Sequence, residues 1–103
     1  MSVKLDIPNF NGMEEPKEVK EWILAVEKFF EYKGIDEEYG MKYAALAFTK
    51  LAFYWYENLK KTRARKGKTE IRTWSKLKKH LQKYFIPKED VESVTRVHTA
   101  SMT

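Results

Sequence analysis

A stripe of apolar residues recurs with the period of an α-helix between residues 16 and 34, which points to a fold built from packed helices. The apolar positions stand three or four residues apart or directly adjacent, and charged residues fill the gaps. Pro16 suits a first helical turn, where its missing N–H would lack a partner anyway, and Gly34 suits the exit. We therefore predict a helix from Pro16 to Gly34. Its buried face comprises Val19, Trp22, Ile23, Val26, Phe29 and Phe30.

Two acidic clusters precede predicted helices, and both are interpreted as helix starts. Glu14-Glu15 stands before the first helix, and Asp36-Glu37-Glu38 opens a second. Carboxylates cap backbone N–H groups and are stabilised at the positive end of the helix dipole. This explanation is favoured over a cation site, so no metal ligands are nominated.

The segment from residue 36 to residue 64 has helical character throughout, and its sequence is compatible with either one long helix or two shorter ones. Residues 43–48, "YAALAF", carry little polar face, so the second helix is expected to lie mostly inside. Thr49 is the only good capping residue before the aromatic cluster, which favours a break there and a third helix from Lys50 to Ala64. One long helix from Asp36 is the alternative, because neither Gly nor Pro interrupts the segment after Gly40.

The stretch "LAFYWYENLKK", residues 51–61, could be a stacking platform for bases or part of a helical core. Phe48, Leu51, Ala52, Trp55, Tyr56 and Leu59 share one helical face. Most of the cluster is therefore assigned to the core. Phe53 and Tyr54 fall off that stripe, and either ring, if exposed, would mark a partner surface.

A fourth helix is predicted from Trp74 to Tyr84, with Thr73 as N-cap and Pro87 as the stop. Before the first helix, residues 1–12 read as a short extended arm ending in a turn at Asn11-Gly12. We expect one all-α domain of four to five helices over residues 1–90, followed by a frayed helix or disordered tail over 91–103. The predicted core comprises Trp22, Ile23, Val26, Phe30, Leu46, Ala52, Trp55, Leu59, Trp74, Leu77, Leu81 and Phe85.

Composition excludes several function classes. The chain has 103 residues and no cysteine, which rules out disulfides, thiolate catalysis and cysteine-based zinc sites. With two histidines and no phosphate-cradling glycine loop, no nucleophile with a matched base can be named, so we predict no enzyme, cofactor or metal. No apolar run reaches the roughly 18 residues of a membrane span, and no signal peptide is visible. An intracellular, cytoplasmic protein is expected.

Charge is unevenly distributed along the chain. Residues 1–51 hold 7 Lys/Arg against 10 Asp/Glu, whereas residues 52–103 hold 13 against 5. Such asymmetry can attract a polyanion, or let the acidic half of one copy meet the basic half of another. From residue 60 to residue 83 there are eleven Lys/Arg and the single acid Glu70. The candidate nucleic-acid or assembly surface comprises Lys60, Lys61, Arg63, Arg65, Lys66, Lys68, Arg72, Lys76, Lys79 and Lys83, with Lys78 among them in sequence.

The order of these signals resembles the gag protein of gypsy-type long-terminal-repeat retrotransposons. The landmarks are Phe10 and Gly12 in a turn, Pro16 and Trp22 in the first helix, Ala52 and Trp55 in a later one, then Trp74, Phe85 and Pro87. They cover about residues 4–90. The resemblance implies an all-α lobe like the N-terminal domain of retroviral capsids, in a protein family that assembles into RNA-packaging particles. Without a zinc knuckle or second-lobe helices, the chain is expected to be an excised lobe or a shortened, domesticated copy of this transposable-element protein.

Three functions follow in order of preference. The leading one is a non-enzymatic self-association module that contributes to virus-like particle assembly, with contacts formed partly by the opposite charges of the two halves. The second is binding of RNA or another polyanion through the basic surface. The third is a peptide-binding adaptor, in which the arm from Val3 to Phe10 leaves a hydrophobic groove for partner segments.

Overall fold

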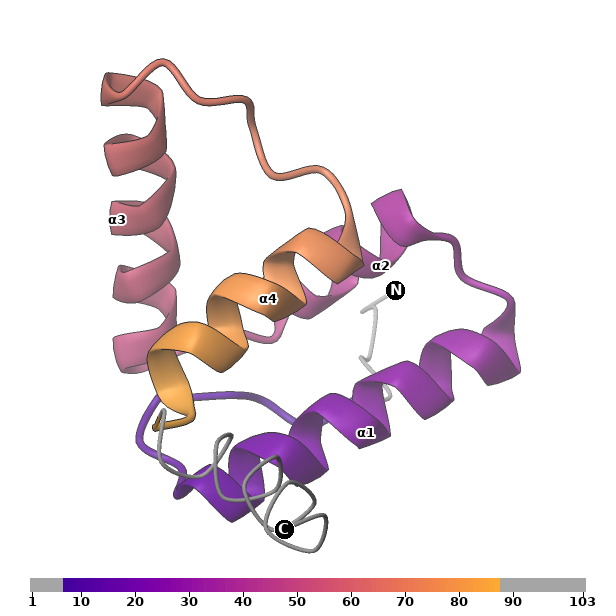
Figure 1. Cartoon of the computed structure of the whole chain (residues 1–103). Helices are drawn as coiled ribbons and strands as arrows, with labels where there is room; N and C mark the ends of the chain where they lie inside the picture. Colours follow the sequence, from indigo (N-terminus) through magenta and orange to yellow (C-terminus); the bar gives the residue numbers. More distant parts are fainter. Residues whose placement is uncertain (1–6, 88–103) are drawn as a thin grey trace, which may run out of the picture.

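The computed structural model describes residues 7–87, and within them the chain forms four α-helices (Figure 1). They are α1 (Pro16–Lys33), α2 (Glu37–Leu46), α3 (Lys50–Arg65) and α4 (Trp74–Phe85). The all-α prediction is confirmed. The tail predicted over residues 91–103 lies outside the described residues, as does the arm before Ile7.

Helix starts follow the predicted acidic clusters. Glu15 and Glu18 form a reciprocal capping box at the start of α1, and Pro16 occupies its first turn. Asp36 accepts a hydrogen bond from the backbone N–H of Tyr39 at 2.9 Å, which caps α2. Gly34 ends α1 with φ of +65°, a conformation that glycine adopts without strain.

The centre of the domain is the packing of α4 against α2 and, less extensively, against α1. Gly40 and Ala44 are the two buried residues of α2. A side chain at Gly40 would come within 3.0 Å of the Phe30 ring and 3.4 Å of Cβ of Trp74. Small residues on this face of α2 therefore allow the helix backbone to approach α4 closely.

The segment before α1 is part of the core. Phe10 is fully buried, and its ring centroid lies 4.9 Å from that of Trp22 and 5.0 Å from that of Phe85. The indole N–H of Trp22 donates to the carbonyl of Pro8 at 2.7 Å. Ile7 is buried as well. Residues 7–10 thus fill a place between α1 and the α3–α4 side of the domain.

The helix is interrupted at Thr49, between α2 and α3, as the sequence favoured. However, the interruption is not stabilised by a side-chain cap from Thr49. The Thr49 side chain makes no capping hydrogen bond. Instead, the Phe10 N–H donates to the Ala47 carbonyl at 2.8 Å, and the Thr49 N–H donates to the Phe10 carbonyl at 2.9 Å. The next residue, Lys50, has φ of +49°, a strained value for a residue with a side chain. The docked arm therefore stabilises the junction between α2 and α3.

The prediction that α2 lies mostly inside, with Leu46 in the core, is wrong. Leu46 is 70% exposed. The buried positions of this segment are Gly40, Ala44, Ala47 and Phe48. Leu46 comes two residues after Ala44 and therefore projects about 200° around the helix from it, away from the core. Only one face of the short α2 packs on the domain, so its apolar composition does not bring every apolar side chain inside.

The other predicted core residues fall into two groups. Fully or nearly fully buried are Trp22, Ile23, Val26, Phe30, Ala52, Trp74, Leu77 and Leu81. Packed against this core and partly buried are Trp55, Leu59 and Phe85. None of the helices in residues 7–87 is long and apolar enough to cross a membrane.

Candidate functional site

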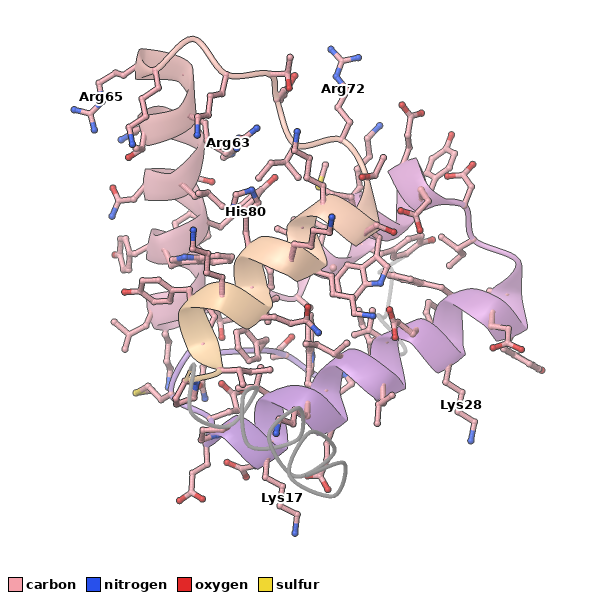
Figure 2. The ribbon with its side chains drawn as sticks, in the orientation of Figure 1. Lys17, Lys28, Arg63, Arg65, Arg72 and His80 are labelled. Carbon is pink, nitrogen blue, oxygen red and sulfur yellow. The ribbon has the colours of Figure 1, made fainter. Side chains whose placement is uncertain are left out.

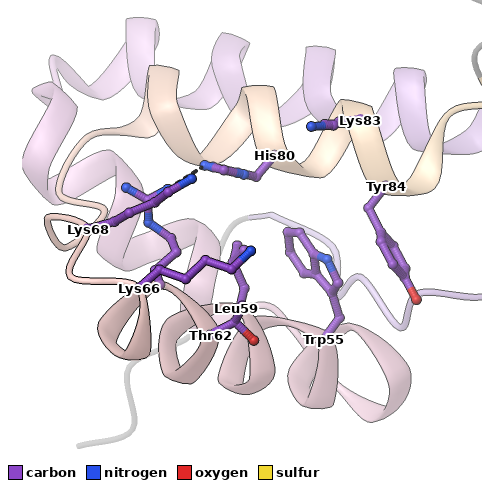
Figure 3. Close-up of a pocket in the computed structure, with 9 residues that line it drawn as sticks. Trp55, Leu59, Thr62, Lys66, Lys68, His80, Lys83 and Tyr84 are labelled. Carbon is purple, nitrogen blue, oxygen red and sulfur yellow. Dashed lines mark hydrogen bonds between the residues drawn. The ribbon is translucent and has the colours of Figure 1, made fainter.

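A groove opens between α3 and α4, because α3 diverges from the other helices after its first turns (Figure 1). Ala52 is the one buried residue of α3, and the connection over residues 66–73 spans from the far end of this helix to the start of α4. The cavity has a volume of about 350 Å³. We call it the basic groove; Figure 3 shows its lining, which comprises Trp55, Leu59, Thr62, Arg63, Lys66, Lys68, His80, Lys83 and Tyr84.

The groove combines an apolar floor with a cationic rim. Trp55, Leu59 and Tyr84 supply the apolar part, and the Trp55 and Tyr84 ring centroids are 5.7 Å apart with a 35° angle between the planes. Tyr84 is 66% exposed. Arginine or lysine comes from α3, the connection and α4, whereas none of the lining residues is acidic. The groove therefore suits an anionic ligand that also presents a flat or apolar group.

Arg63 ties the three elements of the groove together. Its guanidinium donates to the Thr69 carbonyl through Nη2 at 2.8 Å and Nε at 3.3 Å. Its Nη1 lies 3.4 Å from Nε2 of His80 on α4, marked by the dashed line in Figure 3. Burial and the charges of Arg63, Lys76, Lys83 and Lys68 all lower the pKa of His80. A neutral imidazole can accept the Arg63 hydrogen bond, and Arg63 thereby positions the connection over α4.

A second hollow continues the basic groove along α4. It has a volume of about 430 Å³ and shares His80 and Lys83 with the first. Its remaining lining residues are Thr73, Ser75, Lys76 and Lys79. Once more, none of them is acidic, so a cationic track follows α4 from Tyr84 back to Ser75.

Other members of the predicted basic surface lie outside this track or have partners. Lys60 forms an ion pair with Glu57 at 2.9 Å, and Arg72 lies 3.7 Å from Glu70 at an exposed position. Lys78 binds Glu27 of α1 at 2.7 Å. Lys61 and Arg65 are exposed on α3, and Figure 2 shows Arg65 and Arg72 pointing away from the groove. The structure thus brings six of the predicted cations together along the groove and the neighbouring hollow on α4, namely Arg63, Lys66, Lys68, Lys76, Lys79 and Lys83.

The opposite side of α3 carries a different surface. Leu51, Phe53 and Tyr54 are 56%, 46% and 65% exposed, and the Phe53 and Tyr54 rings pack edge to face at 5.6 Å. We call this the outer face of α3. Tyr54 projects about 160° around the helix from buried Ala52, and none of these three residues lines the basic groove, so the two surfaces are separate.

Two members of the groove on α4, His80 and Tyr84, are not among the site residues predicted from the sequence. The signal that could have found them is their spacing, because His80, Lys83 and Tyr84 are three and four residues apart and share one helical face. Among residues 7–87, no group of three or more His, Cys, Asp or Glu is arranged to hold a metal ion.

Comparison with known proteins identifies this architecture. The family model of the N-terminal capsid-like domain of retrotransposon-derived protein PEG10 matches residues 4–86, most of the chain. The chain belongs to this family. The resemblance to retrotransposon gag proteins is therefore confirmed, and the chain is a capsid-like structural domain.

A solved structure of a related domain agrees with this assignment. The dARC1 capsid domain dimer, crystallised in an orthorhombic form, superimposes with a TM-score of 0.62 at 26% sequence identity. The match covers 78% of this chain and 44% of that one, so the capsid-like domain described here spans less than half of its structural relative. A comparison with curated proteins gave no match.

Proposed function

We propose that this capsid-like domain is a non-enzymatic self-association module that contributes to particle assembly. The observation that carries the proposal is the outer face of α3, where Leu51, Phe53 and Tyr54 are exposed within about one turn of the helix. Exposed aromatic rings gathered on one helix face are typical of protein contact surfaces. The related dARC1 domain was crystallised as a dimer, which supports a second copy as the partner.

Charge separation supports the same partner. The first half of the chain carries an excess of acidic residues and the second half an excess of basic ones. Two copies can therefore approach with the acidic surface of one toward the basic surface of the other, while the outer face of α3 supplies the apolar contact. Salt screens such attraction, since the Debye length falls from about 10 Å at 0.1 M to about 3 Å at 1 M.

Sedimentation velocity over a concentration series tests the proposal. The wild-type chain should associate toward millimolar concentration, and association should weaken as salt rises from about 0.1 M to about 1 M. Phe53→Ser with Tyr54→Ser should abolish association without unfolding, because both rings are exposed. The matched control is Leu24→Ser with Tyr32→Ser on α1, where the side chains are 67% and 80% exposed and no contact is proposed. A wild-type chain that stays monomeric at millimolar concentration in low salt contradicts the proposal.

The peptide-adaptor alternative is not favoured by the described residues. Ile7 and Phe10 are buried in the core. Within the described part of the arm, these two side chains occupy the hydrophobic space that a partner segment would need.

A further inference from the structure

The basic groove and the hollow beside it form one continuous track that the self-association proposal does not use. The two share His80 and Lys83, and together they follow α4 from Ser75 to Tyr84. The nine steps from Ser75 to Tyr84 along the helix correspond to about 14 Å, which is longer than a single phosphate or carboxylate group requires. The ligand should therefore be a chain of anionic units.

Flat apolar surface lies at one end of this track. Tyr84 is 66% exposed, and its ring lies beside that of Trp55, which also contacts Phe85 at a ring-centroid distance of 5.0 Å. Contact with the core orients the Trp55 ring, and Tyr84 leaves much of its surface open. Bases stack on such rings once they are free of a duplex, whatever their identity.

We propose that the track binds single-stranded nucleic acid, with a base stacked on Tyr84 beside Trp55 and the phosphates along the cations of α4 and the connection. Lys68 and Lys83 flank His80 from two elements, and Arg63 approaches it from the third. The sugar–phosphate backbone of a nucleic acid carries one negative charge per nucleotide. This repeated charge complements the lysines and arginine of the track, which has no acidic lining residue. Stacking on Tyr84 distinguishes a nucleic acid from an acidic protein segment, because the carboxylates of a protein segment carry no nucleobase.

His80 provides an internal reporter of the phosphates. Arg63, Lys68, Lys76 and Lys83 face it from α3, the connection and α4, and together with burial they lower the pKa of the imidazole. A bound phosphate chain would offset these positive charges and raise that pKa. His80 protonation followed by NMR should therefore shift to higher pH when nucleic acid is added.

The direct test is fluorescence anisotropy with a labelled single-stranded RNA of about 12 nucleotides, within the usual range of single-strand sites. The full chain should bind at about 50 mM salt and release the RNA as salt approaches 200 mM. Lys68→Ala with Lys83→Ala should lower the slope of log affinity against log salt by roughly 1.4, because each lost phosphate contact contributes about 0.7. Both lysines are exposed, so the fold should be kept.

Matched variants separate a specific track from diffuse charge. Lys17→Ala with Lys28→Ala removes the same charge from exposed positions on α1, which point away from the groove in Figure 2, and should leave the salt slope unchanged. Tyr84→Ala should weaken binding by about five-fold or more, whereas Tyr84→Phe should retain it, because the ring and not the hydroxyl stacks. The Phe53→Ser/Tyr54→Ser variant should bind RNA normally, since its substitutions lie on the outer face of α3.

Three results would overturn the proposal. The first is the absence of RNA binding at about 50 mM salt, where phosphate contacts are strongest. The second is an equal loss of affinity in the groove and α1 lysine variants. The third is displacement of RNA by polyglutamate at similar concentration together with no effect of Tyr84→Ala, which would assign the track to acidic protein segments.

Discussion

Glu27 joins α1 to α4 through one carboxylate oxygen, and its removal should measurably destabilise the domain. Oε2 accepts a hydrogen bond from Nε1 of Trp74 at 3.0 Å and from Nζ of Lys78 at 2.7 Å. Burial raises the pKa of Glu27, but the hydrogen bonds from Lys78 and Trp74 and the charge of Lys78 together outweigh it, so the pKa lies below its ordinary value of 4.5. Both side chains of the ion pair are about one-third exposed.

The expected magnitude follows from what each donor loses. In Glu27→Ala the Trp74 indole, which is 4% exposed, loses its partner, and an unsatisfied buried donor costs about 1–3 kcal/mol. The partly exposed pair with Lys78 adds no more than about 1 kcal/mol, because solvent screens it. We therefore expect a total of about 2 kcal/mol. Glu27→Gln should cost about half as much, since an amide oxygen can still accept from Trp74.

Urea unfolding followed by circular dichroism measures this loss. With a slope of about 1–3 kcal/mol per molar urea, a 2 kcal/mol loss shifts the midpoint by roughly 0.7–2 M. Because the folded-state pKa is depressed, the contribution of the ionised carboxylate is fully present above pH 4.5 and is lost as the pH falls through the lower folded-state pKa. The difference between wild type and Glu27→Gln should therefore shrink on acidification. Equal destabilisation by Gln and Ala, or a difference that persists in acid, would refute the reasoning.

Two further substitutions test the backbone and the surface. Gly12→Ala should destabilise the domain by more than about 1 kcal/mol in the same assay, because φ is +89° and the new Cβ would lie 2.6 Å from the Ala52 nitrogen. Gly67→Ala is the control, with φ of +71° but open space around the position, so equal losses would exclude the steric contact as the cause. Leu46→Ser should change stability by no more than about 0.5 kcal/mol, as expected for an exposed side chain. A loss of stability of about 2 kcal/mol or more would instead indicate that Leu46 is buried in the core.

Local patterns in the sequence are enough to predict α1 and α4. Both helices carry a single apolar stripe with the helical period, and their starts coincide with residues that cap backbone N–H groups. Hydrogen bonds within one turn and the apolar character of one face depend on neighbouring residues and not on distant parts of the chain. For the same reason the sequence could indicate that Phe53 and Tyr54 lie off the buried stripe of α3.

The tertiary structure alone decided the features that depend on how helices meet. Leu46 is exposed because only one face of α2 packs on the domain, and the break at Thr49 is held by backbone hydrogen bonds to Phe10, far away in sequence. The distribution of charge along the sequence predicted a basic surface. It did not predict that α3 would diverge from α4, or that Arg63 would contact His80 and Trp55 would lie beside Tyr84. Periodicity fixes which face of a helix is apolar, whereas the angle between two helices depends on contacts between residues that no local pattern relates.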